Sequence, residues 1–134
     1  QIARAYAVIA NGGYLVTPYL SKIGKANIDY LEPIKVDIDP QHLQVIRNGL
    51  SKVVQSGTGV SINYGSNNFP PISGKTGTAE DALGGSDHAW FVCFAPSENS
   101  ELVIVAFAEN TPGGGSVHAL PMAKKILEEW YKKK

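Results

Sequence analysis

The chain has 134 residues, of which 43% are hydrophobic and 18% are charged. That length supports one domain with a buried core and is too short for two. Its 12 basic and 12 acidic residues cancel, so no overall positive field is available to hold nucleic acid or an anionic membrane surface. Cys93 is the only cysteine in the sequence, which excludes an internal disulfide and a cysteine-based metal cage.

Residues 1–11 are predicted to form a helix that ends at Asn11-Gly12-Gly13, because glycine accepts the left-handed backbone of a helix C-terminus. Its apolar side repeats at helical spacing and consists of Ile2, Ala5, Tyr6 and Ile9. The sequence does not begin with Met, and no residue typical of an N-cap precedes the helix. We therefore expect Gln1 to lie at the edge of a helix and the chain to be part of a longer protein.

A second helix is predicted over 40–56. Asp39 suits the N-cap and Pro40 the first helical position, where a missing N–H costs nothing, while Gly57 ends the helix. Its expected buried side consists of Leu43, Ile46, Leu50, Val53 and Val54. Short extended segments are expected at 14–16 and between 19 and 38, and the Gly, Ser, Asn and Pro content of 58–71 predicts a loop.

Three strands are predicted in the second half of the chain. Residues 89–95 and 102–108 are β-branched and aromatic runs joined by a polar connector, which predicts an antiparallel hairpin. Neither run alternates with polar residues, so helices are expected to cover both of its faces. Residues 72–80 form a third candidate strand, weakened by Gly74 and Gly77. The aromatic side chains expected in the core are Tyr6, Trp90, Phe91, Phe94, Phe107 and Trp130.

A last helix is predicted over 120–132. Its expected apolar side consists of Met122, Ala123, Ile126, Leu127 and Trp130. Gly113-Gly114-Gly115 is expected to be a flexible connector into this helix rather than an anion-binding nest. The fold class is therefore α+β, with a three-stranded antiparallel sheet flanked by helices over 1–11, 40–56 and 120–132.

The segment 73–80, with the sequence SGKTGTAE, allows two functional interpretations. The first is a phosphate-binding loop, because Gly74-Lys75-Thr76 matches the end of that motif. The motif also needs a glycine at the position of Phe69 and a helix directly after Thr76. Both are missing from the pattern, so nucleotide binding is disfavoured.

The second interpretation is the Lys-Thr-Gly element of penicillin-recognising serine enzymes. On a strand edge, Lys75 would supply a positive charge for a carboxylate, and Thr76 and Thr78 would offer hydroxyl donors. Gly77 would let a substrate lie against the backbone, and such an edge can bind a peptide through backbone hydrogen bonds. An ordinary strand with a bulge at Gly77 is the non-functional alternative.

Several segments around this motif occur in an informative order: ARAYAVIANGG at 3–13, Pro18, SGKTGTAE at 73–80, HAWF at 88–91, FAP at 94–96 and ENTPGGG at 109–115. Nearly the whole chain resembles the C-terminal part of the transpeptidase domain of a class B penicillin-binding protein, of the elongation type similar to penicillin-binding protein 2. The resemblance implies part of a penicillin-binding or serine β-lactamase-like fold, whose first two strands would precede this chain and pair beyond 102–108. Exposed edges of that kind favour self-association.

The resemblance also implies residue roles. Lys75 would pair with the serine of a Ser-x-Asn element and attract the terminal carboxylate of the substrate. The hydroxyls of Thr76 and Thr78 would bind that carboxylate beside Gly77, and the Thr78 N–H would form half of the oxyanion hole. Three Ser-x-Asn matches start at Ser61, Ser66 and Ser97. All are rejected, because in the family the element lies far upstream of Lys-Thr-Gly.

No serine in this sequence has a lysine three residues later, so the Ser-x-x-Lys nucleophile of the family is not in this chain. The fragment alone is expected to be inactive. The longer protein is expected to crosslink stem peptides ending in D-Ala-D-Ala, to bind β-lactams, and to use no cofactor or metal. By the resemblance it would be anchored in the cytoplasmic membrane with this domain outside, and its partner here would be the upstream part of the same domain.

Two other functions remain open: a piece of a serine β-lactamase or β-lactam sensor, and a non-catalytic interaction module with the same fold. The histidines add no metal pattern. His88 is expected to be structural or exposed, and His42 and His118 are scattered away from it. Cys93 is expected to be a small core hydrophobe.

Overall fold

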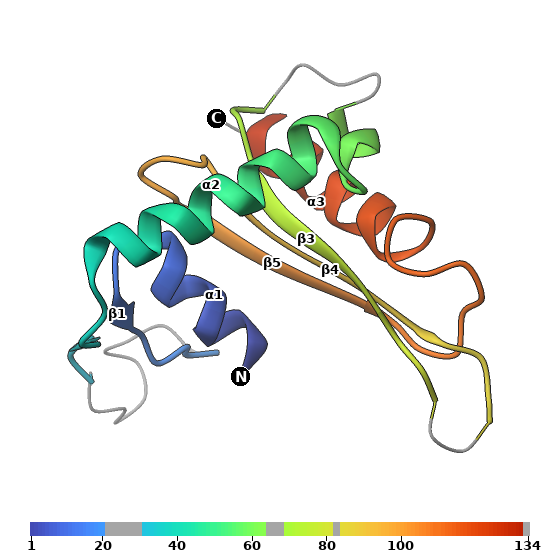
Figure 1. The fold of residues 1–134 in the computed structure, drawn as a ribbon, viewed down its shortest axis with the longest axis horizontal. Coiled ribbons are helices and arrows are strands. Elements are labelled where there is room, and N and C mark those ends of the chain that lie inside the picture. Colours follow the sequence, from blue (N-terminus) through green and yellow to red (C-terminus); the bar gives the residue numbers. More distant parts are fainter. Residues whose placement is uncertain (21–30, 64–68, 82–83, 133–134) are drawn as a thin grey trace.

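The computed structural model describes residues 1–20, 31–63, 69–81 and 84–132. A three-stranded antiparallel sheet has the order β3 (Ser73–Ala79), β4 (His88–Ala95) and β5 (Leu102–Ala108). Three α-helices surround it, α1 (Ile2–Ala10), α2 (Pro40–Ser56) and α3 (Ala119–Lys132), as Figure 1 shows. The predicted α+β class, the three strands and the three helices are confirmed.

The register of the sheet places each side chain on one of its two faces. Residues opposite each other across antiparallel strands point to the same face. Thr76 lies opposite Phe91, and Lys75 lies opposite Val92. The β4–β5 pairing runs from Ala89 opposite Ala108 to Ala95 opposite Leu102, which confirms the predicted hairpin and its connector.

The hydrophobic core consists of two clusters on opposite faces of the sheet. The larger cluster joins β4 to α3 through the buried side chains of Phe91, Cys93 and Leu127. The smaller one packs Phe94 against Ala10 of α1 and Leu50 of α2. Successive residues of β4 therefore pack against helices on opposite faces of the sheet, which explains why this central strand has no polar face in its sequence.

The helix ends follow the chemistry expected from the sequence. The Asp39 side chain accepts a hydrogen bond from the Gln41 N–H at 2.8 Å and caps α2, with Pro40 in the first turn. Gly12, with a φ of 81°, turns the chain after α1, and the Gly13 N–H donates to the Val8 carbonyl at 2.7 Å. Left-handed glycines of this type are the usual way to end a helix.

The predicted buried sides of α2 and α3 are wrong in part. Ile46 of α2 is 43% exposed, and on α3 the exposed apolar side chains are Met122, Ile126 and Trp130. The buried side of α3 is instead formed by Ala119, Leu120, Ala123 and Leu127. Met122, Ile126 and Trp130 follow each other four residues apart, so they form a regular apolar stripe of their own. Helical periodicity predicts such a stripe but does not say which stripe meets the sheet.

Other details also differ from the sequence predictions. The predicted loop over 58–71 contains the 3₁₀ helix η1 (Val60–Asn63). By contrast, the extended segments expected around Tyr14 and Ile34 are confirmed, because β1 (Tyr14–Leu15) and β2 (Ile34–Lys35) are short strands that pair with each other. The Ser66 match lies outside the described residues. Phe107 of the outer strand β5 is exposed. The prediction that helices cover both faces of the hairpin is therefore wrong at this residue. None of the helices in the described part of the chain is long and apolar enough to cross a membrane.

Candidate functional site

Strand β3 carries the Lys-Thr-Gly segment at an edge of the sheet. It pairs with β4 on one side, and among the described residues no strand pairs with its other side. A cavity of about 390 Å³ opens beside it and is lined by Thr58, residues 75–78 and residues 113–116. Because edge strands keep unpaired backbone donors and acceptors, this cavity has peptide groups as well as side chains available for a ligand.

Lys75 and the two threonines lie on different faces of β3. The register puts Lys75 on the face of Val92, and Thr76 on the face of Phe91. Lys75 is exposed, and its Nζ donates to the carbonyl of Thr76 at 2.6 Å. Thr78 is also exposed. An accessible ammonium and an accessible hydroxyl therefore flank Gly77 on the strand that borders the cavity.

Thr76 differs from its neighbours because its side chain is buried, with 9% of its surface exposed. Its Oγ1 lies 2.7 Å from the Oγ1 of Thr58, which follows the end of α2. Thr58 belongs to none of the motifs recognised in the sequence. The only available signal was its position in Gly57-Thr58-Gly59, a turn directly after a helix.

Gly114 and Gly115 are buried parts of the site wall rather than only a connector. A Cβ on Gly115 would lie 2.9 Å from the N and 2.7 Å from the O of Gly77, and would collide with the carbonyl of Trp90. A Cβ on Gly114 would lie 2.5 Å from Thr78 Oγ1. The loop can approach β3 this closely only without side chains.

The remaining singled-out residues are not among those that line this cavity. His88 Nδ1 accepts from the Asn110 N–H at 3.1 Å, and His118 Nε2 lies 2.6 Å from the carbonyl of Pro112. His42 is exposed in the first turn of α2.

Burial raises the pKa of the Cys93 thiol to about 12, as expected of a core residue. Within the described ranges, no three His, Cys, Asp or Glu side chains gather in a way that could hold a metal ion.

The two described Ser-x-Asn matches also serve local structure. Asn63, which ends the match at Ser61, donates from Nδ2 to the Val54 carbonyl at 2.9 Å. Ser97 lies in the β4–β5 connector, where its Oγ accepts from Ser73 Oγ at 2.9 Å. Since Ser73 begins β3, Ser97 is at the end of that strand away from Thr78.

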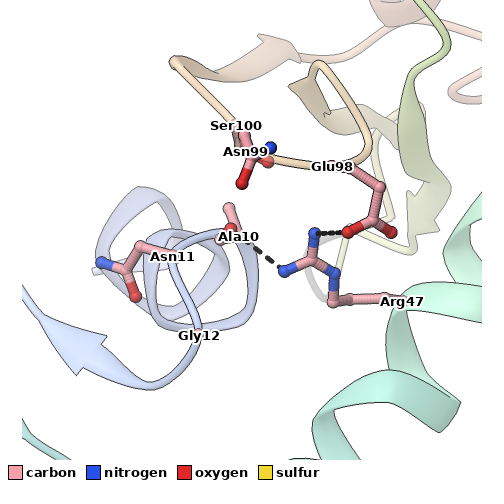
Figure 2. Close-up of a pocket in the computed structure, with 7 residues that line it drawn as sticks. All are labelled: Ala10, Asn11, Gly12, Arg47, Glu98, Asn99 and Ser100. Atoms are coloured by element: carbon pink, nitrogen blue, oxygen red, sulfur yellow. Dashed lines mark hydrogen bonds and ion pairs between the residues drawn. The ribbon is translucent and has the colours of Figure 1, made fainter.

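A second cavity, of about 510 Å³, lies between α1, α2 and the β4–β5 connector. Figure 2 shows Arg47 reaching from α2 toward both other elements. Its Nη2 donates to the Ser97 carbonyl at 2.6 Å and contacts Glu98 Oε2 at 3.1 Å, and its Nη1 donates to the Ala10 carbonyl at 3.3 Å. Arg47 therefore joins three elements of the fold, which its sequence position did not indicate.

Comparison with known proteins identifies the family to which this arrangement belongs. Residues 1–128 match the family described as the penicillin binding protein transpeptidase domain. The chain is a member of this family. That result confirms the resemblance found in the sequence, and the relatives below place it near penicillin-binding protein 2.

The chain is 30% identical to the peptidoglycan D,D-transpeptidase MrdA of Haemophilus influenzae, over 96% of its own length and 23% of that protein. A crystal structure of PBP2 from Pseudomonas aeruginosa is 31% identical, with a TM-score of 0.78, over 96% of this chain and 29% of that one. The structure of the imipenem acyl-enzyme complex of penicillin-binding protein A from Mycobacterium tuberculosis is 25% identical, with a TM-score of 0.73. That match covers 98% of this chain and 30% of the other. The chain thus spans less than a third of each of these transpeptidase-family relatives.

Proposed function

We propose that this chain supplies one wall of the active site of a peptidoglycan D,D-transpeptidase, in which β3 binds the end of a stem peptide. The observation that carries the proposal is the exposed Lys75 and Thr78 on an edge strand beside a cavity. The ammonium of Lys75 favours a nearby carboxylate through its charge. The hydroxyls of Thr76 and Thr78 add directed donors beside Gly77, where no side chain blocks the approach of a peptide.

The backbone of Thr78 has a separate role in this proposal. Its N–H forms half of an oxyanion hole, which stabilises the negative charge that develops on the attacked carbonyl oxygen. A preorganised donor of this kind is worth about 3–4 kcal/mol in the transition state. The edge position of β3 supports this role, because an N–H on that side need not be engaged in sheet pairing.

The reaction requires a serine outside this chain. The serine Oγ attacks the carbonyl carbon of the penultimate D-Ala, an ester bond forms, the peptide bond breaks, and the terminal D-Ala leaves with a proton on its amine. An amine of a neighbouring strand then attacks the ester and restores the serine hydroxyl. A β-lactam ring can acylate the same serine, and the imipenem acyl-enzyme of the mycobacterial relative supports that part of the proposal.

We further propose that the full protein is anchored in the cytoplasmic membrane, with this domain on its outer side. The support is its family membership and its likeness to a peptidoglycan transpeptidase. The upstream part of the same domain would then be the main partner of this chain. It would bring the nucleophile to β3 and cover the outer edge of β5.

Labelled penicillin tests the proposal in the full-length protein that contains this chain. We expect a stable covalent adduct with the wild type and its loss in Lys75→Ala. Lys52→Ala is the matched control, because Lys52 is exposed on α2 and should leave labelling unchanged. No labelling of the wild type would reject the enzyme in favour of a non-catalytic module. Rapid hydrolysis of the adduct would instead indicate a β-lactamase.

A further inference from the structure

Two hydroxyls in the lining of the cavity contact each other, and they come from different elements. Thr58 is exposed in the turn after α2, whereas Thr76 is buried in β3. Their Oγ1 atoms are 2.7 Å apart, which is the usual length of a hydrogen bond between hydroxyls. Both residues line the cavity beside β3, so this bond belongs to the surface that a ligand would contact.

The turn that holds Thr58 is tightly built. The N–H groups of Gly57 and Gly59 both donate to the carbonyl of Val53, at 3.1 and 3.0 Å. A Cβ on Gly57 would lie 2.9 Å from the Val53 Cα, and one on Gly59 would lie 3.2 Å from the Val53 oxygen. The two glycines therefore wrap the chain around the last turn of α2 and fix the backbone on both sides of Thr58.

The chemistry of a hydroxyl limits what Thr76 can do in this arrangement. A threonine hydroxyl has one proton to donate and two lone pairs that accept. If Thr76 donates its proton to Thr58, that proton is no longer available for a ligand. If Thr58 donates to Thr76, the Thr76 proton stays free, and accepting a bond makes Thr76 a stronger donor.

We propose that Thr58 is a positioning residue that donates to Thr76 Oγ1 and so aims the Thr76 proton at a ligand carboxylate. This inference rests on the proposed function, since it assigns Thr58 to the same carboxylate site. The carboxylate favours the required direction of the bond, because an anion accepts protons only. Thr58 acts through Thr76 and takes no part in the bond making or bond breaking at the serine.

The test compares ligands that differ only in the carboxylate. Acylation rates of the full-length protein are measured with benzylpenicillin and with its methyl ester. Thr58→Val keeps the shape and removes the hydroxyl, and we expect it to slow acylation by benzylpenicillin about three- to tenfold, the range of one hydrogen bond. The methyl ester should change by less than about twofold, since a neutral ester gains little from a directed donor. Thr58→Ser restores the hydroxyl and should restore the rate.

A second comparison asks whether Thr58 works through Thr76. In Thr76→Val, the further change Thr58→Val should cost nothing, because the two hydroxyls act as one unit. Thermal denaturation checks that each variant is folded, and Thr58→Ala replaces Thr58→Val if the latter is not. An equal loss with both ligands, or no loss with either, overturns the positioning role. A wild type that neither ligand acylates overturns the proposed function itself and the inference with it.

Discussion

Arg47 and Ser97 are joined across the fold by a 2.6 Å hydrogen bond from the guanidinium to the Ser97 carbonyl. The Arg47 side chain is only 13% exposed, and its Nη1 donates to the carbonyl of Ala10 at the end of α1. Helix α2 is thereby fastened to the connector from which β5 begins and to the helix that packs behind Phe94. The stability of this corner therefore depends on one side chain.

Replacing that side chain should destabilise the corner. We expect Arg47→Met to lower the free energy of unfolding by about 2–3 kcal/mol, because several carbonyls lose a charged donor that water replaces poorly. Urea denaturation of the full-length protein measures the effect. Lys52→Met, on the exposed side of the same helix, is the control and should change stability by less than about 0.5 kcal/mol. Equal midpoints for both variants would contradict the fastening role of Arg47.

A methyl group at Gly115 should damage the site directly. Gly115→Ala places a Cβ against the backbone of Gly77 and the carbonyl of Trp90, so either the loop or β3 must shift. We expect β-lactam labelling to fall at least about tenfold, because small misplacements of site groups carry such costs.

Gly49→Ala is the matched control for Gly115→Ala. No atom lies within 4 Å of a Cβ at Gly49, which is in the middle of α2. Alanine is the better helix residue, so this variant should gain about 0.5–1 kcal/mol of stability and label normally. Normal labelling of Gly115→Ala would show that the loop has room to move.

Cys93 should make stability depend on pH at the alkaline end. Burial raises its pKa from 9.0 to about 12, so the folded state keeps the thiol proton while the unfolded state loses it. The stabilisation is complete below pH 9.0 and declines as the pH rises toward 12. Denaturation from pH 8 to 11 should show a steeper loss for the wild type than for Cys93→Ala. Parallel curves would contradict the burial of the thiol.

The outer edge of β5 should control association of residues 1–134 made as a separate chain. Among the described strands, only β4 pairs with β5, and β5 is rich in β-branched residues, a combination that favours edge-to-edge contact. We expect concentration-dependent oligomers by light scattering after size exclusion. Val105→Lys should reduce them, because an edge lysine disfavours pairing. Val45→Lys, at an exposed position on α2, should not. A lone monomer at every concentration would refute the expectation.

Local chemistry made much of the fold predictable. Asp39-Pro40 marks the start of α2, and the connector after β4 marks a hairpin, because caps and turns are decided by neighbouring residues. The buried side of α3 was not predictable, since Trp130 and Leu127 are both apolar and only the position of the sheet separates them. The exposure of Phe107 has the same origin.

Only part of the candidate site could be predicted from the sequence. Lys75 and its neighbours belong to one short motif, so their placement on one strand followed directly. Thr58 could not be linked to Thr76, because the contact joins a turn to a strand 18 residues away and neither residue type is distinctive. Gly113-Gly114-Gly115 suggested flexibility, whereas its lack of side chains in fact permits close packing against β3.

Where Gly77 faces Gly115, peptide planes meet with nothing between them. The separation at that point is therefore set by main-chain atomic radii, and no rotamer change can widen it. Accommodation of bulkier molecules would have to come from displacement of the entire loop after β5, or from exchanges among the side chains that surround this rigid contact.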